Sequence, residues 1–75
     1  MLFIFLVPDM NITLNGNSKH FKDISTVADL IAVLGYQGKR IAVERNGEIV
    51  PKSQHADAAL SENDQIEIVV AVGGG

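Results

Sequence analysis

Residues 41–50 read Ile-Ala-Val-Glu-Arg-Asn-Gly-Glu-Ile-Val and predict a β-hairpin. Asn46-Gly47 lies between two β-prone runs, and Asn-Gly is the strongest short hairpin signal because both residues tolerate the positive φ of a type I′ turn. A two-residue loop at this point pairs Arg45 with Glu48, which brings opposite charges together. We expect these two side chains to form an exposed surface pair that adds little stability.

An amphipathic helix is predicted just before this hairpin. Apolar residues recur with helical spacing on one face, at Val27, Leu30, Ile31 and Leu34. Thr26 is a suitable N-cap, and Asp29 three residues later completes a pattern that resembles a capping box. Gly35 suits the left-handed position that follows the C-terminus of a helix.

The residues before the helix predict a second hairpin, over about residues 10–22. Residues 11–14 alternate polar and apolar side chains, and the Asn, Gly and Ser residues that follow are typical of a turn. We place a two-residue loop at Gly16-Asn17, because this register sets Phe21 opposite Ile12 on the buried face.

The last predicted strand covers residues 65–72 and has the most continuous β-branched run of the chain. Alternate residues from Ile66 to Val70 would face the core. We expect this strand to lie at the centre of the sheet, because such a run needs cover from neighbouring elements. Between the second hairpin and this strand, residues 52–60 predict one short helical turn, with Leu60 as an apolar anchor.

The order of elements is therefore ββαββ, a short helical turn, and β. Each hairpin and the helix has one apolar face, so the economical fold is α+β: a mixed sheet packed on one main helix, which is the β-grasp (ubiquitin-like) pattern. We assign residues 10–72 to this domain and residues 73–75 to a flexible glycine tail. The predicted core consists of Phe21, Val27, Leu30, Ile31, Leu34, Val43, Val50, Ile66 and Ile68.

Residues 1–9 stand apart from this pattern. Residues 1–7 are apolar and uncharged, and Pro8 separates them from the first strand. Seven residues are too few to span a membrane, and the basic region and cleavage site of a signal peptide are missing, so we expect a cytoplasmic protein with no membrane partner. We interpret residues 1–9 as an apolar extension upstream of an initiator at Met10. An extra strand or a partner-binding arm is the alternative.

The composition excludes several classes of protein. A chain of 75 residues makes one domain, and the absence of cysteine excludes disulfides, thiolate zinc sites, cysteine nucleophiles and cysteine-bound iron–sulfur clusters. His20 and His55 have no metal-ligand spacing, so we expect them to be solvated or locally hydrogen-bonded. Six basic and nine acidic residues give a net charge of −3, which argues against nucleic acid as a partner. We therefore expect no metal, no bound cofactor and no nucleic-acid partner.

The ending Val72-Gly73-Gly74-Gly75 carries the candidate chemistry. Three glycines remove every side chain next to a carboxylate at Gly75, which suits insertion into a narrow active site. Reaction with ATP would convert this poor electrophile into an acyl-adenylate, and a sulfur nucleophile could then displace AMP to leave a thiocarboxylate. The alternative interpretation is a frayed tail or a cloning remnant.

The chain from Met10 to Gly75 resembles the ThiS family of thiamine-biosynthesis sulfur carriers. The residues that carry this resemblance are Thr26-Val27 with Leu30, residues 41–52, Asp64-Gln-Ile-Glu-Ile68 and Val72-Gly-Gly-Gly75. Within residues 41–52, the run Asn-Gly-x-Ile-Val-Pro is the most specific part.

The resemblance implies a protein co-substrate rather than an enzyme. It implies that a ThiF-type adenylyltransferase consumes ATP to adenylate Gly75, that the end becomes a thiocarboxylate, and that a thiazole synthase of the ThiG type receives the sulfur. Gly73 and Gly74 would serve as the tail. A MoaD-type small subunit of molybdopterin synthase shares the fold and the tail, but the Asn-Gly-x-Ile-Val-Pro run favours the thiamine assignment. The glycine ending argues against a non-covalent β-grasp interaction module.

Val69, Ala71 and Val72 are candidates for partner docking. By strand alternation, Val69 and Ala71 point away from the core, and all three residues lie close to the tail. Apolar residues at such positions can form a patch that docks a partner enzyme. The alternative is that a neighbouring element, such as residues 1–7, covers them.

Overall fold

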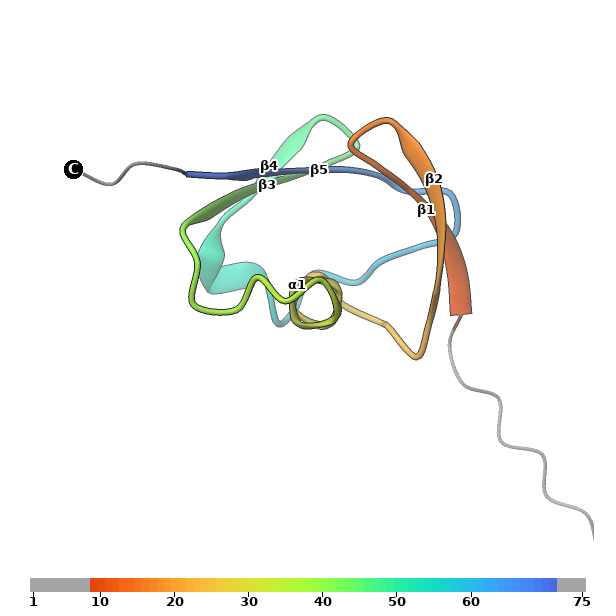
Figure 1. Ribbon diagram of the computed structural model, residues 1–75, viewed down its shortest axis with the longest axis horizontal. Coiled ribbons are helices and arrows are strands. Elements are labelled where there is room, and N and C mark those ends of the chain that lie inside the picture. The colour runs from red at the N-terminus through yellow and green to blue at the C-terminus, as the bar shows by residue number, and fades with distance from the viewer. Residues whose placement is uncertain (1–8, 72–75) are drawn as a thin grey trace, which may run out of the picture.

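The structure is a computed structural model and describes residues 9–71. Its helices and strands follow one another in the predicted order (Figure 1). They are β1 (Asp9–Leu14), β2 (Asn17–Lys22), α1 (Val27–Val33), β3 (Ile41–Arg45), β4 (Glu48–Val50), the short helical turn η1 (Lys52–Gln54) and β5 (Gln65–Val70).

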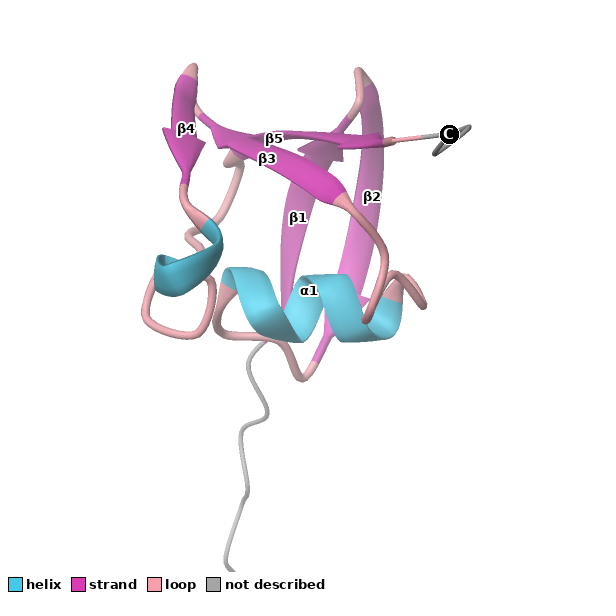
Figure 2. Ribbon diagram, turned by 90° about the vertical axis from the view of Figure 1, so that its left-hand side faces the viewer, coloured by secondary structure: helices cyan, strands magenta, loops and turns pink. Residues whose placement is uncertain are grey.

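β5 lies at the centre of the sheet, whose strand order is β2-β1-β5-β3-β4. It runs parallel to β1 and antiparallel to β3. The sheet curves around α1, which covers its inner face (Figures 1 and 2). A strand with neighbours on both sides and a helix against one face buries much of its surface, which is why the most continuous β-branched run occupies this position.

The helix α1 begins and ends as its sequence predicts. The N–H of Asp29 donates to Oγ1 of Thr26 at 3.2 Å and the N–H of Thr26 donates to the Asp29 carboxylate at 3.1 Å, which completes a capping box. Gly35 follows the last turn at φ +76°. The first two N–H groups of α1 donate to the carbonyls of Ala58 and His55, so the chain after η1 closes the start of the helix.

One hydrophobic core fills the space between α1 and the sheet. Its buried apolar residues are Met10, Ile12, Leu14, Ile24, Val27, Leu30, Ile31, Val43, Leu60, Ile66 and Ile68. Among the predicted core residues, Phe21, Leu34 and Val50 lie partly buried at the margin, and the others are fully part of the core. Ile24 is buried although it lies in the loop between β2 and α1, where no periodic pattern marks it.

The first hairpin forms from β1 and β2, but its predicted register is wrong by two residues. Asn15 and Gly16 make the loop, so Phe21 lies opposite Met10 instead of Ile12. Asn15 has φ +49° and Gly16 has φ +84°, as a type I′ turn requires at both positions. A shift by two keeps every side chain on its face of the sheet, so Phe21 still packs against the core.

The second hairpin, β3 and β4, turns at Asn46-Gly47 in the predicted register. Arg45 lies opposite Glu48, but the expected side-chain pair is replaced by another: Nε of Arg45 donates to Oδ2 of Asp64 at 2.7 Å. Asp64 is only 6% exposed. A buried carboxylate needs hydrogen-bond donors, whereas the exposed carboxylate of Glu48 is solvated by water. The Arg45 guanidinium therefore donates to Asp64.

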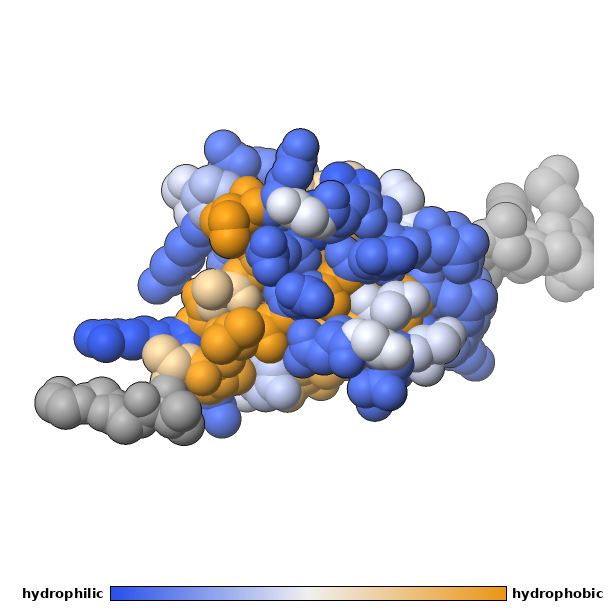
Figure 3. Space-filling model, turned by 90° about the horizontal axis from the view of Figure 1, so that it is seen from above, coloured by the Kyte–Doolittle hydropathy of each residue, from blue (hydrophilic) through white to orange (hydrophobic). Residues whose placement is uncertain are grey.

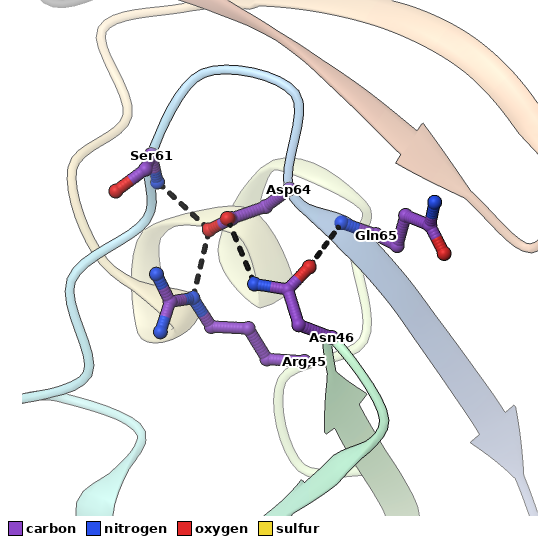
Figure 4. A network of polar contacts seen from close by, with 5 residues as sticks. All are labelled: Arg45, Asn46, Ser61, Asp64 and Gln65. Atoms are coloured by element: carbon purple, nitrogen blue, oxygen red, sulfur yellow. Dashed lines mark hydrogen bonds and ion pairs between the residues drawn. The ribbon is translucent and has the colours of Figure 1, made fainter.

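Asp64 stands at the centre of a network that ties the second hairpin to the loop before β5 (Figure 4). Its Oδ1 accepts a hydrogen bond from Nδ2 of Asn46 at 3.0 Å, and its Oδ2 also accepts from the N–H of Ser61 at 2.8 Å. The Asn46 side chain reaches further, because its Oδ1 accepts from the N–H of Gln65 at 2.9 Å. The turn of the second hairpin therefore fixes the start of β5.

Asn15 ties the first turn to β5 in the same manner. Its N–H donates to the carbonyl of Ile66 at 2.9 Å. Its side-chain Oδ1 accepts from the N–H of Ile68 at 2.9 Å, and its Nδ2 donates to the Ile68 carbonyl at 3.2 Å. The Asn15 side chain thus acts as an additional peptide group beside β5, beyond the point where β1 ends.

The ends of the predicted domain are described only in part. β1 begins at Asp9, one residue before the boundary that we predicted. The rest of the predicted extension, residues 1–8, and the predicted glycine tail, residues 73–75, lie outside the described residues. Within residues 9–71, the protein has no helix with the length and apolar character that crossing a membrane requires.

Replacing Leu30 with Ala should lower the free energy of unfolding by about 2–5 kcal/mol, because it leaves a cavity between α1 and the sheet. Val33 lies on the same helix but is 57% exposed, so Val33→Ala is the matched control. It should change the free energy of unfolding by less than about 0.5 kcal/mol. Urea unfolding followed by circular dichroism measures both, and equal losses would contradict the assigned buried face.

Asp64 should make the stability of the fold depend on pH. Burial alone raises the pKa of Asp64, but hydrogen bonds from Asn46, Arg45 and Ser61, together with the Arg45 charge, outweigh burial and lower that pKa. The folded-state pKa is thus below the unfolded-state value of about 3.9. The ionised carboxylate therefore stabilises the fold above about pH 4, and this contribution is lost as the pH falls through the folded-state pKa.

Unfolding of Asp64→Asn in urea at several pH values tests this dependence. The variant should be less stable than the unaltered protein by about 1–3 kcal/mol at neutral pH, and the difference should shrink below about pH 4. Asp57→Asn removes the same charge at an exposed position and serves as the control. A difference that stays constant from neutral to strongly acidic pH would rule out a stabilising role for the Asp64 charge.

Candidate functional site

β5 leaves the sheet at the end where β3 begins. The last residue pair between the two strands is Ile41 with Val70, and the N–H of Ala71 then donates to the carbonyl of Arg40 at 2.9 Å. The predicted reacting residue and its tail belong to residues 72–75, which lie outside the described residues. What the structure does place is the point from which that tail follows, at the end of the central strand (Figure 1).

The outer face of the sheet, opposite α1, carries exposed apolar side chains beside this point. Val69 is 65% exposed and lies opposite Ala42 of β3, and Ala71 is also exposed. Seen from above, apolar side chains gather toward one end of the molecule (Figure 3). As far as residues 9–71 are concerned, Val69 and Ala71 are open to solvent. The alternative cover that we considered, residues 1–7, lies outside the described residues.

A groove of about 500 Å³ adjoins these side chains. Its apolar lining comes from Ile31, Tyr36, Ile41, Ala42, Val69 and Ala71. The loop of residues 37–40, between α1 and β3, forms another part of the lining, and Lys52 and His55 complete it. The groove therefore joins the exposed end of β5 to the C-terminal end of α1.

Among residues 9–71, the Lys, Arg, Asp and Glu residues that line the groove are all basic. These residues are Lys39, Arg40 and Lys52. Nζ of Lys39 lies 5.7 Å from the centre of the Tyr36 ring, which is within the range of a cation–π interaction. No carboxylate lines the groove, and neither ion pair found within residues 9–71 includes any of the three cations. The end of β5 thus has a positive and partly apolar surrounding.

The start of β5 has the opposite character on the same outer face. Glu44 and Glu67 lie directly opposite each other on β3 and β5. They line a second hollow, of about 220 Å³, together with Thr13 and Gln65 among others. Like charges at opposed positions of a sheet are unfavourable. The outer face of β5 is therefore acidic at the start of the strand, whereas the end of the strand adjoins the basic and partly apolar groove.

Sequence reasoning found the exposed pair Val69 and Ala71 but missed the groove. Lys39-Arg40 is the only pair of adjacent basic residues in the chain, and that was the available signal. Their position beside Ala71 depends on the pairing of β3 with β5, and the sequence alone does not specify which strands become neighbours.

The two histidines make local contacts, as predicted. Nδ1 of His20 lies 2.9 Å from Oδ1 of Asn11, and Nε2 of His55 lies 3.1 Å from the carbonyl oxygen of Val50. Among residues 9–71, no group of three or more His, Cys, Asp or Glu side chains could hold a metal ion.

Known proteins resemble this chain along nearly its whole length. A sequence model of the ThiS family matches residues 12–75. The chain belongs to the ThiS family. It is 44% identical to the sulfur carrier protein ThiS of Bacillus subtilis (strain 168) over 63 residues, which cover 83% of this chain and 96% of that protein.

A solved ThiS structure has the same fold. The crystal structure of the thiamine biosynthesis protein ThiS from Geobacter metallireducens matches with a TM-score of 0.74 at 29% sequence identity. The match covers 88% of this chain and 100% of that chain. The β-grasp fold predicted from the order of elements is thereby confirmed.

Two larger proteins contain a segment similar to this ThiS-family chain. They are thiazole synthases of Paramagnetospirillum magneticum, at 44% identity, and of Magnetococcus marinus, at 38% identity. Each match extends over 66 residues, which are 88% of this chain but 20% of the thiazole synthase. The chain therefore spans about a fifth of the length of these relatives.

Adjacent residues of β5 should respond very differently to truncation. Ile68 is buried in the core, so Ile68→Ala should lower the free energy of unfolding by about 2–5 kcal/mol. Val69 points to the outer face, so Val69→Ala should lower it by less than about 1 kcal/mol. Urea unfolding of both variants measures the contrast. A loss at Val69 as large as that at Ile68 would show that the outer face of β5 is covered in solution.

Proposed function

We propose that this ThiS-family chain is a sulfur carrier of thiamine biosynthesis that works through a carboxylate at Gly75. The observation that carries the proposal is the combination of a central strand that ends at Val70, followed by exposed Ala71, with the sequence Val72-Gly-Gly-Gly75 after it. The identity of 44% over nearly the whole length of a sulfur carrier protein ThiS supports it. That identity also favours thiamine biosynthesis over a role as a MoaD-type subunit of molybdopterin synthase.

The first chemical step is activation of the carboxylate. A carboxylate oxygen of Gly75 attacks the α-phosphorus of ATP and releases pyrophosphate, which leaves an acyl-adenylate. The partner enzyme, of the ThiF type, holds ATP and supplies the stabilisation of the transition state. The carrier supplies the reacting carboxylate at the end of three glycines, and glycine suits a narrow channel because it has no side chain and the widest choice of backbone conformations.

The second step exchanges oxygen for sulfur without a change of oxidation state. A sulfur nucleophile at the level of sulfide attacks the acyl carbon, the bond to AMP breaks, and a thiocarboxylate remains. The thiocarboxylate then donates its sulfur to a thiazole synthase of the ThiG type. The similarity to segments of two thiazole synthases supports this partner.

No side chain of the chain acts in this chemistry. The carrier has no cysteine, and its last four residues contain no ionisable side chain. It is a protein co-substrate with no cofactor of its own, and ATP is consumed by the adenylating enzyme. The folded domain contributes a rigid base for the tail and a surface by which partners recognise it.

Removing Gly74 and Gly75 should abolish adenylation and leave the domain folded, because the elements of the described domain are complete at Val70, where β5 ends. Appending one residue after Gly75 should also abolish it, since the carboxylate then lies beyond the position where ATP is held. Gly74→Val should suppress the reaction because a β-branched side chain obstructs a narrow channel and restricts φ. The measurement is the intact mass of the protein after incubation with ATP and a ThiF-type enzyme.

Thermal unfolding of the same variants is the control, and all of them should melt close to the unaltered protein. The proposal fails if the extended variant is converted at its new end at a normal rate. It also fails if the mass increase maps to a side chain instead of the C-terminal residue.

A further inference from the structure

The groove beside the end of β5 has a charge that the composition of the chain does not predict. The chain has nine acidic and six basic residues, yet among residues 9–71 three of those basic residues and no acidic residue line this one groove. Arg40 is the residue whose carbonyl holds Ala71 in place, so the positive charge adjoins the point where the tail begins.

Ion pairs within residues 9–71 do not hold these cations in place, although Lys39 lies near the ring of Tyr36. Lys39, Arg40 and Lys52 are exposed, and none of them takes part in an ion pair within residues 9–71. By contrast, Arg45 is committed to the buried carboxylate of Asp64. Like charges gathered without carboxylate partners repel one another in the free protein. Such an arrangement becomes favourable when a surface of opposite charge binds.

We propose that this groove docks an acidic segment, bearing apolar side chains, of the adenylating enzyme. The inference rests on the proposed function and names the recognition surface for it. The carboxylates of the segment pair with Lys39, Arg40 and Lys52, while its apolar side chains bury Val69, Ala42 and the ring of Tyr36. Docking at this place holds the start of the tail and directs it into the active site.

The apolar part of the lining identifies a protein segment as the occupant. A nucleic-acid backbone would need a continuous basic stripe, whereas about half of the lining residues here are apolar. A protein interface combines an apolar centre with a charged rim, which is the arrangement that Val69 and the three cations offer. Its size, about 500 Å³, suits a few side chains of a partner.

The two glutamates at the start of β5 also favour one direction of docking. An acidic segment is attracted to the end of β5 and repelled from Glu44 and Glu67 at its start. A partner turned the other way around would place its acidic segment against those carboxylates. The active site of the partner therefore faces the tail rather than the opposite end of the sheet.

Binding of the full chain to its ThiF-type enzyme in the absence of ATP tests the groove separately from the chemistry. Isothermal titration calorimetry should show that Lys39→Glu combined with Arg40→Glu weakens binding at least about tenfold. Lys19→Glu combined with Lys22→Glu makes the same charge change on β2, away from the groove, and should weaken binding less than about threefold. Binding of the unaltered protein should weaken as salt is added.

Two apolar residues with matched exposure provide a second test. Val69 is 65% exposed within the groove, and Ile49 is 66% exposed on β4 outside it. Val69→Ser should weaken binding at least about fivefold, and Ile49→Ser should leave it nearly unchanged. Melting curves confirm that each variant is folded, and a misfolded variant is replaced by the corresponding substitution to Ala.

The outcomes separate this proposal from the proposed function. If the double variant on β2 weakens binding as much as the double variant in the groove, the groove is not the docking site and the effect is one of net charge alone. Absence of ATP-free binding by the unaltered protein would also overturn it. If the groove variants lose binding as expected but the unaltered protein gains no mass with ATP, the groove stands and the sulfur-carrier chemistry fails.

Discussion

The fold depends on how its central strand is held from both sides by two asparagine side chains. Each of the two type I′ turns presents an asparagine, Asn15 or Asn46, and each bonds to the backbone of β5. β1 pairs with β5 at only two positions, Thr13 with Gln65 and Leu14 with Ile66, so the Asn15 amide continues a ladder that would otherwise stop. A peptide-like side chain can do this because it has one donor side and one acceptor side in a single plane.

This arrangement separates the rigid part of the protein from the part that we propose reacts. The start of β5 is fixed by the Asp64 network, its middle by Asn15, and its end by the bond from Ala71 to Arg40. The domain therefore presents a defined surface up to Ala71, and the sequence Val72-Gly-Gly-Gly75 follows that surface. A partner that binds this surface would hold the proposed reacting end at a high effective concentration.

Short sequence signals predicted most of this fold, but they do not predict features that depend on which strands become neighbours. Asn-Gly at 46–47, the Thr26–Asp29 capping box and Gly35 each specify backbone geometry within a few residues, and each was found as expected. The first turn was misplaced because a loop at Gly16-Asn17 and a loop at Asn15-Gly16 both put Phe21 on the buried face. The two loops differ in which residues need positive φ, and in the structure these residues are Asn15 and Gly16. The partner of Arg45 and the groove beside Ala71 depend on strand neighbours, which short-range patterns do not encode.

The two asparagines are also sites at which the protein can deamidate with time. In both turns the next residue is glycine, whose unhindered N–H can attack the preceding side-chain amide and expel ammonia. The resulting aspartate or isoaspartate lacks the Nδ2 donor. In one turn this donor binds the Ile68 carbonyl, and in the other it binds the Asp64 carboxylate. In the second turn, deamidation would also set a new negative charge against the buried Asp64. The hydrogen bonds that hold β5 restrain both amides from that attack, so the folded state protects the residues on which it depends.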